Sequence, residues 1–434
     1  MAASLPTAVR ALVHAIARPE DVRLHAHEIG VVKRQRSVDV WALVTSVIFT
    51  VANRGPHSIA AMRNAYQKAS GHEITRSAFW DRLTPSFTRL LGWMLDRLVA
   101  KANDECPTPP GIFARFRDVR ALDSSVVPVH AKLTWLWRGT RKTYKAALKV
   151  HTTVRVFTGE LLRYRITAEV FADCKAAVFG TDIRGILFLF DMGYSSPSLW
   201  SSIDRRGGYF LTRLPTDRNP RIVGSLRKHR GRARPAKNAV WSTFVEGIHR
   251  RYVDVQAEFR IHIKGRAGRR GRKELVHFRV VGVLNAETGE YHRYVTNIPV
   301  DWIPAEHIRD AYRLRWEVET FYKLTKSGAA LDELSSAQPH IVRAMVLAAL
   351  FRVAAATMLR ARHGHRIPAG RRVNPIAWVR HVIARLSEIL AVLVIDRCEI
   401  ERSMVPNEVL DPNRRRMPTR EKFGPLAELA FKAD

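Results

Sequence analysis

A short apolar run near the middle of the chain constrains the fold more than any other feature. The segment GILFLFDMGY, residues 185–194, is continuously apolar until it reaches Asp191. A strand with one face in water alternates apolar and polar residues, whereas a continuously apolar strand is covered on both faces. We therefore expect a mixed α/β fold in which this strand lies inside the protein and ends at Asp191.

Further strand-like segments lie on both sides of this run. DVRALDSSVVPV, residues 118–129, predicts one strand, and AALKVHTTVRVFTGELLRYRITAEV, residues 146–170, predicts two strands joined around Gly159. Between residues 200 and 300, the segments GGYFLTRL, RRYVDVQAEFRIHI, ELVHFRVVGVLN and EYHRYVTNIP are also strand-like. The basic loops RKHRGRARPAK and KGRAGRRGRK between them fit either solvated tips or segments that follow phosphates.

Helical segments precede the strands. WALVTSVIFTVAN, residues 41–53, predicts a buried helix within a helical region that extends to residue 105. SIAAMRNAYQKASGHEITRSAFWDRL, residues 58–83, predicts two helices separated by Gly71, the second beginning near Thr75 or Ser77. This pattern fits a DNA-binding helix-turn-helix and an ordinary helical hairpin equally well.

The residue pattern again predicts helices from residue 304 to residue 395. Its most apolar part, AMVLAALFRVAAATML, carries Arg352 in the middle and is too short to span a bilayer comfortably, so it predicts a buried helix. The start of the chain lacks the layout of a signal peptide. We therefore expect a soluble, cytoplasmic protein without a membrane partner.

The charge balance indicates a polyanionic partner. The chain has 72 Lys and Arg against 40 Asp and Glu, a formal net charge of +32. Such a charge repels itself, and nucleic acid would offset the repulsion because neutralised phosphates release counterions. A solvated basic surface or an anionic membrane are the alternatives. Cys106, Cys174 and Cys398 are far apart, which indicates a reducing compartment without disulfides or a structural zinc site.

One stretch, YRLRWEVETFYKLTK at residues 312–326, gathers polar residues in a stripe. We expect it to continue a helix that begins near Pro304. At about 100° per residue, four polar residues share a narrow arc of this helix, namely Tyr312, Arg315, Glu319 and Lys326. Four apolar residues form the opposite, core-facing side, namely Leu314, Val318, Phe321 and Leu324. The stripe therefore faces a cleft or solvent, although an ordinary charged surface helix has the same pattern.

Two strand aspartates complete the constellation. Asp123 lies within one predicted strand and Asp191 ends another, and sites in α/β proteins are built at the carboxyl ends of strands. With Glu319 they supply the oxygen ligands that hold two Mg²⁺ ions for phosphoryl transfer, and Mn²⁺ can substitute. Arg315 and Lys326 beside them would bind DNA phosphates.

These residues resemble the DDE transposases of bacterial insertion sequences that carry the signature Y-x2-R-x3-E-x6-K. Tyr312, Arg315, Glu319 and Lys326 match this spacing without a gap. The texts ALDSS and FLFDMGY match the surroundings of the two family aspartates, with Met192 where arginine is more usual. The resemblance covers residues 115 to 350.

The resemblance implies an RNase H-like catalytic core interrupted by a β-rich insertion. It makes Asp123, Asp191 and Glu319 the catalytic, metal-binding triad, and it places Tyr312, Arg315 and Lys326 on DNA near the cleaved end. The implied chemistry is nicking, hairpin formation at the transposon end, hairpin opening and strand transfer by a 3′-hydroxyl, carried out by a homodimer on double-stranded DNA.

A tryptophan stacks a flipped base in related enzymes, which indicates Trp316 or Trp302. A core position explains either residue equally well, and we favour the core for both.

Pattern and resemblance together divide the chain into five segments. These are a helical N-terminal DNA-binding region (1–110), the first part of the core (111–200), the β-rich insertion (201–300), the second part of the core with the Glu319 helix (301–360) and a helical C-terminal region with a basic tail (361–434). Two other functions stay open: a DNA-binding descendant that has lost catalysis, and an RNase H-like nuclease without strand transfer. The nuclease would not need the stripe around Glu319.

Overall fold

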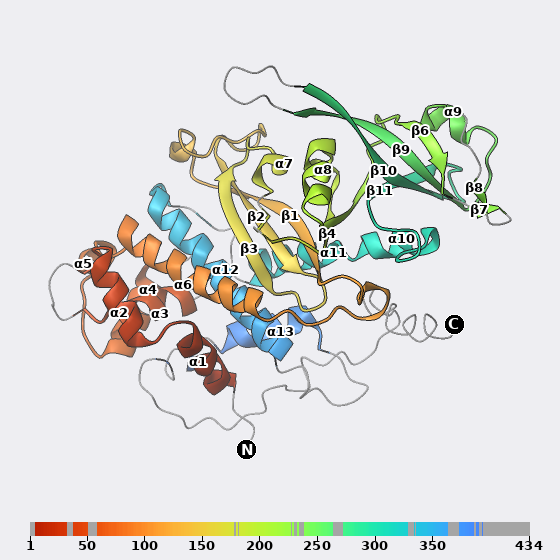
Figure 1. Ribbon diagram of the computed structural model, residues 1–434. Coiled ribbons are helices and arrows are strands. Elements are labelled where there is room, and N and C mark those ends of the chain that lie inside the picture. The colour runs from red at the N-terminus through yellow and green to blue at the C-terminus, as the bar shows by residue number, and fades with distance from the viewer. Residues whose placement is uncertain are drawn as a thin grey trace.

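Figure 1 shows the computed structural model of the chain. It describes residues 5–32, 38–50, 59–177, 179–180, 182–226, 228–229, 232–233, 238–263, 272–328, 334, 336–362, 373–385, 388–389 and 393. Most of the two basic loops, Cys398 and the basic tail lie outside these residues. Of the three cysteines, Cys106 and Cys174 lie within the described residues, where both are free thiols.

A large mixed sheet forms the centre of the described part of the chain. Its strands follow the order β3-β2-β1-β4-β5-β11-β10-β9-β6. Their bounds are β1 Asp118–Pro128, β2 Ala147–Arg155, β3 Leu161–Ala168, β4 Ile186–Phe190, β5 Tyr209–Arg213, β6 Arg221–Ser225, β9 Tyr252–Ile263, β10 Arg272–Leu284 and β11 Tyr291–Thr296. The neighbours β1, β4 and β5 are parallel and the other pairs are antiparallel. Two short strands, β7 Lys228–His229 and β8 Arg232–Ala233, pair separately.

Strand β4 is buried on both faces, as its apolar run predicts. Leu187 and Leu189 belong to one hydrophobic cluster, which also takes in residues of the helices α6 Pro85–Asp104 and α12 Pro339–Arg362. Ile186, Phe188 and Phe190 belong to a second cluster, with residues of α8 Pro197–Arg205. Because successive side chains of a strand point to opposite faces, each face needs its own apolar partner. The sheet is therefore a layer between helices (Figure 1).

The strands of residues 201–300 extend this sheet instead of forming a second one. β5 hydrogen bonds to β4 in parallel, and β11 joins β5 to the long antiparallel pair β9 and β10. The β-rich texture of this stretch is confirmed. The sheet itself does not break at the expected boundary between residues 200 and 201.

The N-terminal region is helical, as expected. Its helices are α1 Leu5–Ile16, α2 Pro19–Glu28, α3 Val40–Phe49, α4 Ile59–Ser70, α5 Arg76–Trp80 and α6. All residues of α3 are buried, which confirms the predicted buried helix. Gly71 ends α4 with a positive φ of 69°, and the Thr75 hydroxyl accepts from the amide of Ala78 at 3.2 Å to cap α5. The helical pair around Gly71 is thus present, although its second helix is short.

Helix α12 is longer than its apolar core suggested. It has 24 residues and is the one described helix that is long and apolar enough to cross a membrane, but 94% of its most apolar window is buried inside the protein. Arg352 within it donates to the carbonyl oxygen of Ile48 at 2.6 Å, and burial lowers its pKa to about 9. The prediction of a buried helix is confirmed.

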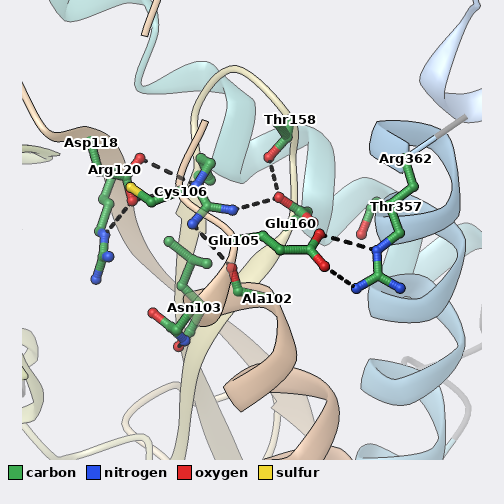
Figure 2. A network of polar contacts seen from close by, with 12 residues as sticks. Ala102, Asn103, Glu105, Cys106, Asp118, Arg120, Thr158, Glu160, Thr357 and Arg362 are labelled. Atoms are coloured by element: carbon green, nitrogen blue, oxygen red, sulfur yellow. Dashed lines mark hydrogen bonds and ion pairs between the residues drawn. The ribbon is translucent and has the colours of Figure 1, made fainter. Parts of the chain in front are cut away.

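A buried ion network anchors the start of β1. Arg155 at the end of β2 binds Asp118 at 3.3 Å and Glu160 at 2.5 Å, and it donates to the carbonyl oxygen of Ala102 on α6 at 3.1 Å. Figure 2 shows Asp118, Glu160 and Thr158 converging at this point. Breaking such a buried pair costs about 3–5 kcal/mol. The network therefore fixes the strand that carries Asp123 five residues further on.

Candidate active site

Parallel pairing of β1 and β4 brings the two predicted aspartates together. Leu122 on β1 lies opposite Phe190 on β4, and each is followed by one of the aspartates. β4 ends at this point, whereas β1 continues to Pro128. Asp123 and Asp191 therefore lie at the carboxyl end of β4, as the sequence predicted.

The helix expected to carry the stripe is divided in two. α10 Ala305–Arg313 ends at Leu314, and α11 Trp316–Lys323 begins at Arg315. Between them the backbone bonds tighten to three-residue spacing, with the amide of Arg315 donating to Tyr312 and that of Val318 to Arg315. A π-helical turn, Leu324–Gly328, then follows and carries Lys326. The prediction of one regular helix through Lys326 is therefore wrong.

The two sides of the stripe segment differ in how well they were predicted. The core-facing side is confirmed, because Leu314, Val318, Phe321 and Leu324 are at most 3% exposed. The polar side does not simply face solvent. Tyr312 is 6% and Arg315 is 7% exposed, because both point toward the aspartates on the sheet.

Each carboxylate of the predicted triad contacts the stripe. The Tyr312 hydroxyl donates to Asp191 Oδ1 at 3.3 Å. Arg315 donates through Nη1 to Asp123 Oδ2 at 3.4 Å and through Nη2 to Glu319 Oε1 at 2.5 Å. The guanidinium also lies 5.8 Å from the centre of the Tyr312 ring. The structure thus brings five of the seven predicted site residues into one connected cluster.

The charges of the three carboxylates act on one another. Burial raises the pKa of Asp123, and with the negative charges of Asp191 and Glu319 it brings this pKa to about 6. The Ser124 amide, 2.7 Å from Asp123 Oδ1, and the Arg315 guanidinium oppose this rise. The three acidic side chains therefore share one electrostatic environment.

The expected tight carboxylate cluster is not formed in this arrangement. No group of three or more His, Cys, Asp or Glu among the described residues is placed to hold a metal ion. Arg315 instead supplies the positive charge that Asp123 and Glu319 share. The donor set itself fits a divalent cation, because carboxylate oxygens are what Mg²⁺ and Mn²⁺ prefer. Its chemistry therefore fits such an ion, although two of the three carboxylates are paired with Arg315 in this structure.

For the other two predicted residues, the described part of the chain shows no side-chain hydrogen bond or ion pair with this cluster. Trp316 is 61% exposed, so the preference for a core position is wrong. It follows the break after Leu314 and turns away from the apolar side of α11. Lys326 is half-buried and makes no hydrogen bond or ion pair with the residues that the structure describes. Trp302, in contrast, is half-buried and packs against the core, with ring centres of Phe116 and Tyr209 5.4 and 5.0 Å away.

Sequence reasoning missed Tyr322, which joins α11 to the sheet. Its buried hydroxyl lies 2.8 Å from the carbonyl oxygens of Asp123 and Val150, and it accepts from the Thr152 hydroxyl at 2.8 Å. Burial raises the pKa of Tyr322 well above its ordinary value, so the group stays neutral. Its place three residues after Glu319, on an otherwise apolar side, was the available signal.

A second polar cluster behind Asp123 was also missed. Asp173, on α7 Asp173–Ala176, accepts from the Ser124 hydroxyl at 2.7 Å and pairs with Lys149 at 3.3 Å. His151 Nδ1 lies 3.5 Å from the same carboxylate, and burial lowers the pKa of His151 to about 4. The Ser124 hydroxyl is thereby engaged away from the triad.

The chain is similar to known transposases over most of its length. Residues 114–353 match the family described as Transposase DDE domain. The transposase of insertion sequence element IS231E from Bacillus thuringiensis subsp. finitimus is 22% identical over 334 residues, which cover 70% of this chain and 69% of that protein. The putative transposase InsL of IS186A from Escherichia coli strain K12 is 39% identical over 71 residues, or 16% of this chain and 19% of that protein.

Among solved structures, the chain aligns with the piggyBac transposase in a synaptic complex with hairpin DNA. That structure aligns with 94% of this chain and 86% of its own at 9% sequence identity, with a TM-score of 0.46.

Proposed function

Since the chain belongs to the transposase DDE domain family, we propose that it is a cut-and-paste DNA transposase of a bacterial insertion sequence. It would bind the terminal inverted repeats, cleave the transposon ends by metal-dependent hydrolysis and hairpin formation, and join them to target DNA. Double-stranded DNA is its substrate, and a homodimer pairs the two ends. We place it in the cytoplasm, associated with the nucleoid.

The observation that carries this proposal is the contact of the stripe with the sheet aspartates. Tyr312 binds Asp191, and Arg315 binds Asp123 and Glu319, although these residues are up to 196 positions apart in sequence. An ordinary charged surface helix would keep its Arg315–Glu319 pair in water. Here Arg315 is buried and also binds Asp123 on β1.

We assign Asp123, Asp191 and Glu319 as the catalytic carboxylates and as the ligands of two Mg²⁺ ions, which Mn²⁺ can replace. When bound, such ions activate the attacking oxygen and stabilise the leaving oxygen. Arg315 holds Asp123 and Glu319 together until then. Once freed from these carboxylates, its guanidinium is suited to bind a DNA phosphate with both arms.

The remaining site residues would position DNA. Lys326 is unengaged among the described residues and half-buried beside the cluster, which suits a phosphate contact near the cleaved end. Trp316 is exposed at the start of α11, where it can meet a base. Tyr312 supports Asp191 from α10 and lies next to the same DNA end.

We further propose that the core is RNase H-like. The order β3-β2-β1-β4-β5 supports this, because three antiparallel strands are followed by two that run parallel to β1. In this proposal residues 111–200 and 301–360 form the two parts of the core, residues 201–300 the insertion, residues 1–110 the DNA-binding region and residues 361–434 the C-terminal region.

A strand-transfer assay tests the function. The substrate is a linear DNA that carries the sequences flanking the reading frame, incubated with Mg²⁺ or Mn²⁺ and a target plasmid. Excision with joined products is the expected result. Nicks without joining would favour the RNase H-like nuclease, and binding without cleavage by the wild-type protein would favour the DNA-binding descendant.

A further inference from the structure

The connection between β1 and β2 holds a tryptophan that the proposed active site does not use. Among the described large apolar side chains Trp135 is the most exposed, at 76%. We propose that this connection, residues 129–146, is a second DNA-contacting surface on which Trp135 stacks an unpaired base. The inference rests on the proposed function, since it adds a contact to the same DNA substrate.

The connection is built rigidly, so the exposure of Trp135 is a property of the fold. Leu133 and Trp137 on either side of it are 1% and 2% exposed. The amide of Gly139 donates to the carbonyl oxygen of Lys145 at 3.0 Å, and that of Ala147 donates to Trp137 at 3.0 Å. The two buried anchors therefore hold Trp135 in water between them.

A buried carboxylate fixes the second half of the connection. Glu169 is 6% exposed and accepts from the Thr140 amide at 2.8 Å and from the Tyr144 hydroxyl at 3.1 Å. An aromatic ring held in place loses little conformational freedom when a base stacks on it, which favours binding.

The charges around Trp135 select a polyanion as the partner. Residues 129–146 contain no Asp or Glu and hold five exposed cations, Lys132, Arg138, Arg141, Lys142 and Lys145. Of these, only Arg141 approaches a carboxylate within the described part of the chain, at 3.9 Å from Glu169. The same surface on a second copy would be repelled, because it offers cations and no carboxylate.

The connection lies at the end of the sheet that carries the active site. β1 passes Asp123 and continues to Pro128, beyond the end of β4. At about 3.3 Å per residue these five steps span about 17 Å, which equals about five nucleotides of one strand at 3.4 Å each. In Figure 1 the chain between β1 and β2 turns back at the end of the sheet where α7 also lies. The start of the connection that carries Trp135 is therefore about five nucleotides from Asp123 along β1.

An unpaired base is the fitting ligand because tryptophan offers a flat apolar face and the cations offer phosphate contacts. Stacking on one aromatic side chain changes affinity for single strands by about 5- to 150-fold, largely independent of sequence. Duplex DNA hides its base faces, so it would gain only from the cations.

Fluorescence anisotropy without divalent cations tests the inference. The probes are a blunt duplex of about 20 base pairs and the same duplex with a single-stranded thymidine tail of about eight nucleotides, within the site sizes known for such surfaces. We expect W135A to weaken binding of the tailed probe at least about fivefold and of the blunt probe less than twofold. W135F should retain most of the affinity, and V300A is the control with an exposed apolar side chain elsewhere.

The outcomes separate the surface from the proposed function. If W135A binds both probes like the wild type while the wild type cleaves transposon ends, the surface is refuted and the function stands. If the wild type binds neither probe and cleaves nothing, both fail. A wild-type dimer in DNA-free sedimentation that becomes monomeric in W135A would make this surface a protein interface and overturn the DNA assignment. Crosslinking of a 5-iodouracil tail to Trp135 would support it directly.

Discussion

The hydroxyl group of Tyr322 lies 2.8 Å from the backbone carbonyl oxygen of Asp123, and this contact joins helix α11 to strand β1. Glu319 lies one turn before Tyr322 on the same helix. The distance between the Glu319 and Asp123 carboxylates is therefore set partly by a hydroxyl group that belongs to neither. In a site that must place reacting atoms accurately, such a support contributes to the geometry of the carboxylates.

Replacing Tyr322 with phenylalanine tests this role. The change removes one buried hydroxyl and leaves two carbonyl oxygens and the Thr152 hydroxyl without it, which costs about 1–3 kcal/mol of unfolding free energy. We expect cleavage to slow while DNA-end binding is unchanged, measured by single-turnover nicking and anisotropy. T320S, on the outer side of α11, is the matched control, and equal cleavage by Y322F and wild type would contradict the role.

Amide variants of the triad address the catalytic assignment. In D123N, D191N and E319Q the side chain keeps its shape but loses the charge needed to bind Mg²⁺. We expect the cleavage rate to fall at least about 1,000-fold, equivalent to about 4 kcal/mol of transition-state stabilisation. Binding of transposon ends should change little, because the basic surface is intact. A variant that still cleaves at the wild-type rate would remove its residue from the triad.

Removal of Arg315 tests whether its guanidinium takes the place of a cation. In R315A, Asp123, Asp191 and Glu319 repel one another without compensation, so we expect a loss of roughly 2 kcal/mol of unfolding free energy in chelator. Mn²⁺ should restore more stability to R315A than it adds to the wild type, as measured by urea unfolding.

R315K, which replaces the guanidinium with an ammonium group, is the control. R315K keeps one positive charge but lacks the forked donor group that reaches two carboxylates. Its unfolding free energy in chelator should therefore lie between those of the wild type and R315A. If Mn²⁺ stabilises wild type and R315A equally, the guanidinium does not compete for the site.

Lys326 provides a test of phosphate contact. K326A should weaken binding of a transposon-end duplex and lower the slope of log affinity against log salt by about one, as expected for one lost phosphate contact. R184A, an exposed cation just before the start of β4, controls for the overall charge. A slope that stays at the wild-type value would show that Lys326 does not touch a phosphate.

The buried His151 predicts a pH dependence of stability. Its folded pKa of about 4 lies below the ordinary value of 6.5, because burial disfavours the charged form. As pH falls from 6.5 to 4, the unfolded chain binds a proton that the folded chain does not, so His151 lowers stability over this window. Between pH 6.5 and pH 4, we expect the unfolding free energy of H151Q to fall by about 1–3 kcal/mol less than that of the wild type, as measured by urea unfolding. An identical decline in both proteins would exclude His151 as its source.

The sequence determined the parts of this protein that depend on neighbouring residues. The apolar run before Asp191 specified a strand buried on both faces, Thr75 specified a helix start, and Gly159 specified the turn between β2 and β3, because periodicity and turn chemistry are local. The spacing of the stripe identified its core-facing side for the same reason. The family signature added Asp123, Asp191 and Glu319 as the residues to examine.

Only the tertiary structure decided how these parts meet. The break at Leu314, the π turn at Lys326 and the exposure of Trp316 follow from fitting α10 and α11 against the sheet, which no periodicity encodes. Arg315 bridges Asp123 and Glu319, and Tyr322 joins helix α11 to β1. Both arrangements depend on contacts with Asp123, which lies nearly 200 positions before Arg315 and Tyr322 in the sequence. Such contacts arise from packing in three dimensions, where the free energy of one side chain depends on all of its neighbours.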